Sequence, residues 1–387
     1  TGKDWYKMYV TGLDPAYARM KESWKEHIGY IEDAEQALRP ELENELATLA
    51  ENVAREGFRF VVYNPLPWER GGMVNFVLPS QGSIKEAYVK EVGTGRIYDL
   101  KVYGADSKRL GTFFAEGIPA NGYKTYILTD ESPAQVENSL KGEEQGNYIE
   151  NKWYKVSFDK KKGCIRSIWD KTNKRELVDD QSENGFGSYV YERYDKEQSY
   201  RYLKEYIYDK YKNSHYQITG KSTYLDERTK GIHESPRNME FHVENHKSSI
   251  RGVLTPSAFV GEEKHTAGLT VTLYENMPCI DVKLSVINKP ATEEPEAGWI
   301  ALPFKTKSPE YRVGRIGSVV DPAKDLIEGS QFNYIWSNSG IMIKDEEYSV
   351  GVCPIDAPAF VLGDLDFMHY ADTYENPRSH VYFNLFN

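Results

Sequence analysis

The stretch Tyr148–Leu177, YIENKWYKVSFDKKKGCIRSIWDKTNKREL, decides the fold class of the C-terminal part of the chain. Apolar residues occupy every second position of Trp153–Phe158, and a period of two is typical of a strand with one buried face. The charged run Asp159–Gly163 ends in a glycine that tolerates positive φ, so it predicts a turn. Strand-like residues resume at Cys164–Trp169 and, after a second turn, at Arg175–Val178. We therefore predict a meander of antiparallel strands.

Composition limits the class of protein further. The chain has 387 residues and a formal net charge of −11. This length is typical of two or three domains and is enough to bury a sizeable core. Because an acidic chain lacks the basic footprint that nucleic acids require, we expect no nucleic-acid partner. No run approaches the ~18 apolar residues of a membrane span, so we also expect no membrane association.

The cysteines indicate the cellular compartment, and the two chain ends indicate whether the sequence is a fragment. Cys164, Cys279 and Cys353 lie far apart in strand-like runs, which predicts buried free thiols and favours a cytoplasmic protein. The sequence begins with Thr1 and stops at Asn387 within an apolar run. We therefore expect a fragment of a longer protein.

Residues 1–57 are predicted to form a helical connector. Asp14–Pro15 is a start signal, and an apolar stripe at spacings of three and four follows from Tyr17 to Leu38. Arg39–Pro40 is predicted to end this helix, and a second helix is predicted from Leu42 until Gly57. The resulting antiparallel hairpin cannot bury its own apolar stripes, so we expect it to pack against a partner surface. A second copy of the chain, in a homo-oligomer, is one possible partner.

The rest of the chain is predicted to be mainly β. Six short strand-like runs in residues 58–130 indicate a small antiparallel β-sandwich. The polar segment 131–146 is typical of a linker. Residues 147–387 alternate strand and turn patterns without a sustained helical period, which favours one large two-sheet sandwich. The tyrosine-rich part, Tyr189–Tyr216, is predicted to form amphipathic edge strands or a surface excursion.

Several segments resemble the family 38 glycoside hydrolases, the retaining α-mannosidase family. Their order and spacing carry the resemblance, and they are Val61–Arg70, Tyr148–Leu177, Asn276–Asp281, Trp299–Phe304, Asp321–Asp325 with Glu328–Ser330, and Ala357–Gly363. The resemblance implies a galactose-mutarotase-like β-supersandwich for residues 147–387. It also implies a catalytic α/β barrel that precedes the helical and β parts.

The same resemblance implies zinc, an aspartate nucleophile and an acid/base carboxylate in the whole enzyme. A retaining glycosidase needs two carboxyl groups about 5 Å apart, and a cation can hold sugar hydroxyls. The His-x-Asp and His-His-Asp motifs of the family do not occur in this sequence, nor does the βαβ alternation of a barrel. We therefore expect the barrel and its zinc to lie upstream, and neither a catalytic residue nor a cofactor within this chain.

Four residues are the best candidates for contact with carbohydrate. Asp321, Asp325 and Asp356 can accept hydrogen bonds from sugar hydroxyls, and the face of Trp336 can stack on a sugar ring. The alternative is that Asp-Pro and Gly-Ser pairs make turns without any ligand.

One spacing is compatible with a metal. His242, Glu244 and His246 would share one face of a strand, and two histidines with a carboxylate are a frequent zinc set. Ordinary polar decoration of a surface strand is the alternative, and it is favoured.

Three functions fit these patterns. The first is the non-catalytic C-terminal region of a family 38-like glycoside hydrolase, which supports the barrel and contacts sugar. The second is a stand-alone carbohydrate-binding module. The third is a sandwich-fold epimerase or lyase, for which His233, His242 and His246 could supply proton transfer.

Overall fold

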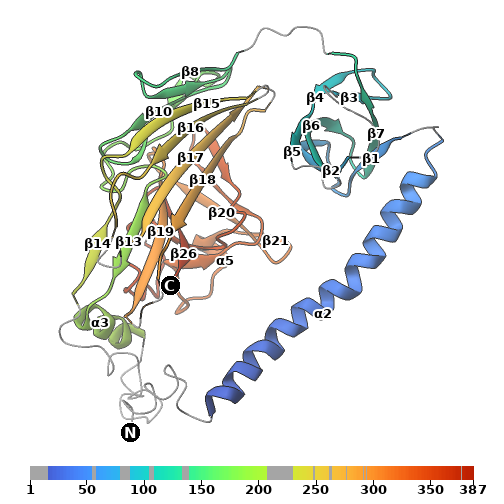
Figure 1. Ribbon diagram of the computed structural model, residues 1–387. Helices are drawn as coiled ribbons and strands as arrows, with labels where there is room; N and C mark the ends of the chain where they lie inside the picture. The colour runs from blue at the N-terminus through green and yellow to red at the C-terminus, as the bar shows by residue number, and fades with distance from the viewer. Residues whose placement is uncertain are drawn as a thin grey trace. The chain divides into compact units, whose positions relative to one another are not determined.

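The computed structural model describes residues 16–54, 58–78, 88–103, 109–132, 139–206, 230–246, 249–260, 264–275, 277–290, 292, 294–375 and 377–387. The described residues before 139 form one compact unit, and those from 139 onward form a second, larger unit (Figure 1). Antiparallel strands dominate both units, which confirms the mainly β fold class. Within the described residues, no helix is both long and apolar enough to cross a membrane.

The helix α2 (Ala16–Glu51) precedes the strands of the smaller unit. The predicted helical hairpin is wrong, because α2 continues through Pro40. A proline removes one hydrogen bond and crowds the preceding turn, but a long helix of good helix formers can absorb this as a bend. The predicted signals at Asp14–Pro15 and Gly57 lie outside the described residues.

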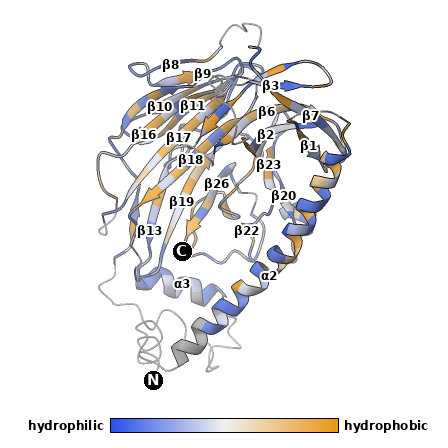
Figure 2. Ribbon diagram, turned by 45° about the vertical axis from the view of Figure 1, so that its right-hand side comes forward, coloured by the Kyte–Doolittle hydropathy of each residue, from blue (hydrophilic) through white to orange (hydrophobic). Residues whose placement is uncertain are grey.

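Several apolar side chains of α2 are exposed. Ile31 is 74% exposed and Leu38 is 69% exposed. Figure 2 shows hydrophobic positions spaced among hydrophilic ones along this helix.

The smaller unit is a sandwich of two antiparallel sheets. One sheet has the strand order β1 (Phe60–Asn64), β7 (Gly122–Thr129), β3 (Tyr88–Glu91), β4 (Ile97–Asp99), and the other has β2 (Arg70–Val77), β6 (Leu110–Ile118), β5 (Lys101–Tyr103). The continuous strand-like run 96–102 is divided between β4 and β5, which belong to different sheets. Phe113 and Tyr126 form the centre of an aromatic core, with ring centroids 4.9 Å apart.

The described residues of the larger unit form four antiparallel sheets. A five-stranded sheet has the order β12 (Arg175–Glu176), β11 (Cys164–Asp170), β10 (Tyr154–Asp159), β9 (Tyr148–Glu150), β8 (Lys141–Glu143). A four-stranded sheet has β15 (Glu240–Asn245), β16 (Ser249–Thr255), β17 (Thr266–Tyr274), β18 (Ile280–Ile287). Because β8 lies within residues 131–146, part of the predicted linker is an edge strand.

The other two sheets come mostly from the C-terminal half. A six-stranded sheet has the order β14 (Ile232–Glu234), β13 (Tyr189–Arg193), β19 (Glu296–Pro303), β26 (His380–Phe386), β25 (Ala359–Leu362), β22 (Tyr334–Trp336). The last sheet has β21 (Ser318–Val320), β20 (Glu310–Arg315), β23 (Gly340–Lys344), β24 (Ser349–Val352). The short helix α5 (Pro322–Asp325) follows β21.

The meander predicted from Tyr148–Leu177 is confirmed. Val156 and Phe158 of β10 are buried, as the alternation required. Gly163 closes the β10–β11 turn with a φ of +65°, and a Cβ there would lie 2.7 Å from Met239 Sδ and from Pro236 O. Glycine is therefore required both by the backbone angle and by the available space.

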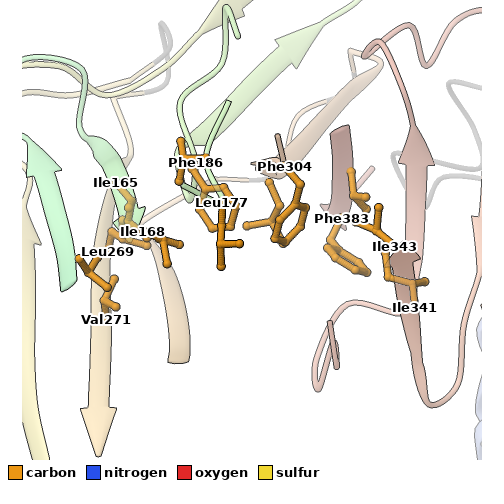
Figure 3. Close-up of a cluster of buried hydrophobic side chains, with 14 of the residues drawn as sticks. Ile165, Ile168, Leu177, Phe186, Leu269, Val271, Phe304, Ile341, Ile343 and Phe383 are labelled. Atoms are coloured by element: carbon orange, nitrogen blue, oxygen red, sulfur yellow. The ribbon is translucent and has the colours of Figure 1, made fainter. Parts of the chain in front are cut away.

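The main hydrophobic core lies among the sheets of the larger unit (Figure 3). Phe186 and Phe304 meet edge to face at a centroid distance of 5.0 Å. Every sheet of this unit contributes buried side chains, including Ile165, Ile168, Leu269, Val271, Ile341, Ile343 and Phe383. The sheets therefore share one continuous core.

Two sequence predictions about this unit are corrected. The tyrosine-rich part contains the fully buried strand β13 and the helix α3 (Lys196–Tyr206), rather than edge strands, and residues 207–229 lie outside the described residues. All three cysteines are free, as predicted, but only Cys164 is buried, and Cys353 is exposed. Cys353 follows the edge strand β24, whose alternate residues face solvent.

Candidate functional site

One face of the six-stranded sheet carries a set of polar side chains, and we call it the network face. Residues opposite each other on paired strands share a face. Glu192 on β13 stands opposite His233 on β14 and Ala297 on β19. Two and four residues further along β19, Trp299 and Ala301 point to the same side, and Ala301 stands opposite Tyr382 on β26. The opposite face contributes Val381 and Phe383 to the main core.

Glu192 is the centre of this set. Its carboxylate accepts hydrogen bonds from Tyr194 Oη at 2.6 Å, Trp299 Nε1 at 3.0 Å and His233 Nδ1 at 3.1 Å. Glu192 is only 8% exposed, and Trp299 is completely buried. A buried carboxylate is costly unless it is hydrogen-bonded, and these three donors meet that requirement. Burial, with the neighbouring carboxylate, raises the pKa of Tyr194, so its hydroxyl stays protonated and donating.

His233 connects the buried carboxylate to solvent. Its side chain is 40% exposed, against 10% for Glu192. The hydrogen bond to Glu192 raises the pKa of His233, and the opposing effect of burial is smaller. The other ring nitrogen, Nε2, lies 3.3 Å from Asn184 Oδ1. A carboxylate–imidazole pair of this kind can hold a proton or pass it to a ligand.

Asn184 extends the network across the sheet. It is 7% exposed and precedes β13. Tyr382 forms side-chain hydrogen bonds with Asn184 and with Ser182, and burial raises its pKa. The chain of contacts therefore runs from Glu192 through His233 and Asn184 to Tyr382.

The segment 364–370 covers the aromatic part of the network face. The ring of Phe367 meets Trp299 edge to face at 5.1 Å and Tyr334 at 5.0 Å. Helix α3 holds this segment, because Arg201 forms an ion pair with Asp366. A second contact joins α3 to the segment, since Glu205 lies 2.9 Å from His369 Nδ1.

Trp336 is the predicted sugar-contact residue that lies on the network face. It follows Tyr334 by two positions on the edge strand β22, and the two rings meet edge to face at 4.7 Å. Trp336 is 48% exposed. Tyr334 Oη in turn donates to Asn384 Oδ1 at 3.3 Å. The indole is therefore oriented by its neighbour and still accessible to a ligand.

The predicted aspartates have other local roles. Asp321 caps α5 by accepting from the backbone N–H of Ala323 at 3.1 Å, and it pairs with Arg312 at 3.0 Å. Asp325 accepts from the backbone N–H of Asp321 at 2.7 Å. Both carboxylates thus hold a turn, in line with the alternative stated above. Asp356 is exposed in the loop between β24 and β25.

The candidate metal set does not form a metal site. His242 and Glu244 point to the exposed side of β15, as the strand period required. His242 lies 3.6 Å from Glu240 and His246 lies 3.5 Å from Glu244, so the residues pair separately with carboxylates. In the part of the chain that the structure describes, no three His, Cys, Asp or Glu residues are arranged to hold a metal ion.

Sequence reasoning identified only part of the network. His233 was considered as a proton-transfer group, whereas Glu192, Tyr194, Asn184 and Trp299 were not proposed. A signal for Glu192 is a carboxylate in a short strand whose preceding residues are aromatic or apolar on both faces, as in Tyr189–Arg193.

Comparison with known proteins identifies the family. Residues 149–354, more than half of the chain, match the family described as the glycosyl hydrolases family 38 C-terminal domain. The chain therefore belongs to this family. No curated protein sequence matches the chain.

Two solved structures are similar to the chain. An alpha-mannosidase from Enterococcus faecalis V583 gives a TM-score of 0.52 at 11% sequence identity, over 84% of this chain and 39% of that one. A protein in the glycosyl hydrolase family 38 from Enterococcus faecalis gives 0.49 at 11% identity, over 84% of this chain and 43% of that one. At this identity the first likeness supports the fold alone. The chain spans well under half the length of either protein.

Proposed function

We propose that this chain is the non-catalytic C-terminal region of an α-mannosidase-like glycoside hydrolase and supports a catalytic barrel elsewhere in the same protein. The observation that carries this proposal is the match of residues 149–354 to the family's C-terminal domain. Zinc and the reacting carboxylates belong to the barrel in this proposal. A cytoplasmic location is part of it, because all three cysteines are free thiols.

Activity measurements test this proposal directly. The purified 387-residue chain is incubated with 4-nitrophenyl α-D-mannoside, with and without added zinc, beside the product of the complete gene. We expect hydrolysis by the complete product and none by the chain alone. Hydrolysis by the chain alone that is lost in Glu192→Gln would place the chemistry within this chain and overturn the proposal.

The network face favours a second role, contact with carbohydrate. It combines an accessible indole, Trp336, with a half-exposed imidazole, His233, and sugars bind through such stacking and hydrogen-bonding groups. The two lie on opposite edge strands, β22 and β14, which are five strand spacings apart in the six-stranded sheet. At ~4.8 Å per strand this separation is roughly 24 Å, which suits an oligosaccharide rather than one sugar.

Titration with mannose and with a mannose oligosaccharide, followed by NMR, tests this role. We expect the oligosaccharide to shift the Trp336 indole signal and to bind less well to Trp336→Ala. Trp169→Ala is the matched control, because Trp169 is similarly exposed, at 41%, on β11 in the five-stranded sheet. Equal loss in both variants, or no binding at all, would rule out the network face. Epimerisation of free mannose in the same spectra would instead favour the sandwich-fold epimerase.

A further inference from the structure

Three residues of the larger unit, two in loops and one on a strand, expose large aliphatic side chains. They are Ile316 in the β20–β21 turn, Val319 on β21 and Ile355 in the β24–β25 loop, at 84%, 70% and 93% exposure. We call these three residues the hairpin patch. Exposed aliphatic residues that gather in one place are unusual on a surface with no partner.

Hydrogen bonds bring the two loops of the hairpin patch to a common neighbour, the turn between β22 and β23. The backbone N–H of Ile316 donates to Asn338 Oδ1 at 3.1 Å. On the other side, Cys353 Sγ donates to the carbonyl of Ser339 at 2.9 Å. Asn338 and Ser339 are adjacent, so the hairpin tip and the start of the Ile355 loop are both hydrogen-bonded to the same turn.

Isoleucine is unfavourable at position 316 for two reasons: its apolar side chain is exposed to water, and its backbone has a positive φ. Arg315 pairs with Ser318, which leaves a two-residue loop of Ile316 and Gly317. Both have positive φ, +47° and +75°, as in the type I′ turn that prefers Asn-Gly. A β-branched residue is strained at the first of these positions. Isoleucine at this position therefore does not stabilise the fold of the 387-residue chain through any contact described above.

We propose that the hairpin patch docks on the catalytic domain of the same protein, with Ile316 as the anchor in an apolar pocket. This inference rests on the proposed function. The length of the relatives argues for this occupant: the chain covers only 39% of the α-mannosidase that shares its fold, so most of such a protein is attached outside the matched region. A tight turn also presents its tip residue in a fixed position, which lowers the entropy cost of docking.

The substitution Ile316→Asn gives opposite expectations in the two forms of the protein. In the 387-residue chain alone, Asn-Gly suits the turn, so the melting temperature of the larger unit should rise. In the complete gene product the anchor is lost, so trypsin should separate the C-terminal region from the rest faster, by roughly fivefold or more. Ile355→Asn should accelerate this cleavage without any gain in the isolated chain, since Ile355 has no positive φ to relieve.

Phe259→Asn is the control outside the hairpin patch. Phe259 is 67% exposed and lies in the β16–β17 loop, so its replacement should leave the cleavage rate unchanged. Cleavage of Ile316→Asn at the wild-type rate would overturn the inference. So would a dimer of the isolated chain that Ile316→Asn dissociates, because the occupant would then be a second copy. Proteolysis does not depend on mannosidase activity, so an inactive gene product would count against the proposed function only.

Discussion

The hydroxyl of Tyr194 is the most direct way to measure what the network around Glu192 contributes. Tyr194→Phe removes the 2.6 Å hydrogen bond to the carboxylate and leaves the ring in place beside Phe367. Tyr194 is 3% exposed and Glu192 is 8% exposed, so water cannot replace the lost donor without a rearrangement. A hydrogen bond to a charged group contributes about 1.5–3 kcal/mol, and we expect Tyr194→Phe to cost about that much.

Calorimetry of the 387-residue chain would measure this cost. Residues 139–387 form one compact unit, and for a domain of about this size each kcal/mol lowers Tm by about 2–4 °C, so the transition should fall by roughly 3–12 °C. The matched control is Tyr334→Phe, whose ring also contacts Phe367 but whose hydroxyl bonds to the neutral Asn384 at 3.3 Å. It should cost about 0.5–1.5 kcal/mol or less. Equal costs for the two variants would refute the special role of the Glu192 carboxylate.

Three further predictions follow from the same structure. NMR titration should find the pKa of His233 above its usual 6.5 in the wild type and lower in Glu192→Gln. The stability linked to this proton is complete below pH 6.5 and is lost as pH rises through the raised pKa. A wild-type pKa at or below 6.5 would contradict the ion pair. Gly163→Ala should destabilise the larger unit by about 1–3 kcal/mol or more in urea unfolding, because the turn needs positive φ and the space is filled; a neutral effect would contradict the described turn. A thiol reagent should modify Cys353 before Cys164, since burial raises the pKa of Cys164 to about 12; the reverse order would place Cys164 at the surface.

Local sequence signals predicted the strands well and the helices less well. The β10–β11 hairpin follows from alternation and from one glycine, both of which act over a few residues. Helix α3 is not predicted from the sequence, although this helix has a start signal. Asp195 and Gln198 form a reciprocal capping box at its N-terminus. Its exposed face is rich in tyrosine, which is more typical of strands, and this composition concealed the helical period. Proline usually ends or bends a helix, but at Pro40 the helix-forming residues on both sides keep α2 continuous.

The candidate site depends on information that no local pattern contains. Glu192 and His233 are 41 residues apart, and only the register of β13 with β14 places them opposite each other. Trp299 comes from a third strand, more than 100 residues after Glu192. Such a site is assembled by strand order, which sequence patterns leave undetermined. Trp336 could be proposed from the sequence because the face of an indole can stack on a sugar whatever its neighbours are, and its contact with carbohydrate stays a prediction.

The division of residues 97–103 between two sheets has a mechanical consequence. β4 pairs with β3 in one sheet of the smaller unit, and β5 pairs with β6 in the other. Leu100, between them, packs in the aromatic core. The two sheets are therefore joined by a covalent tie only one residue long, and neither can slide past the other while both pairings last. Under a pulling force we expect this sandwich to resist shear and then to yield in a single step.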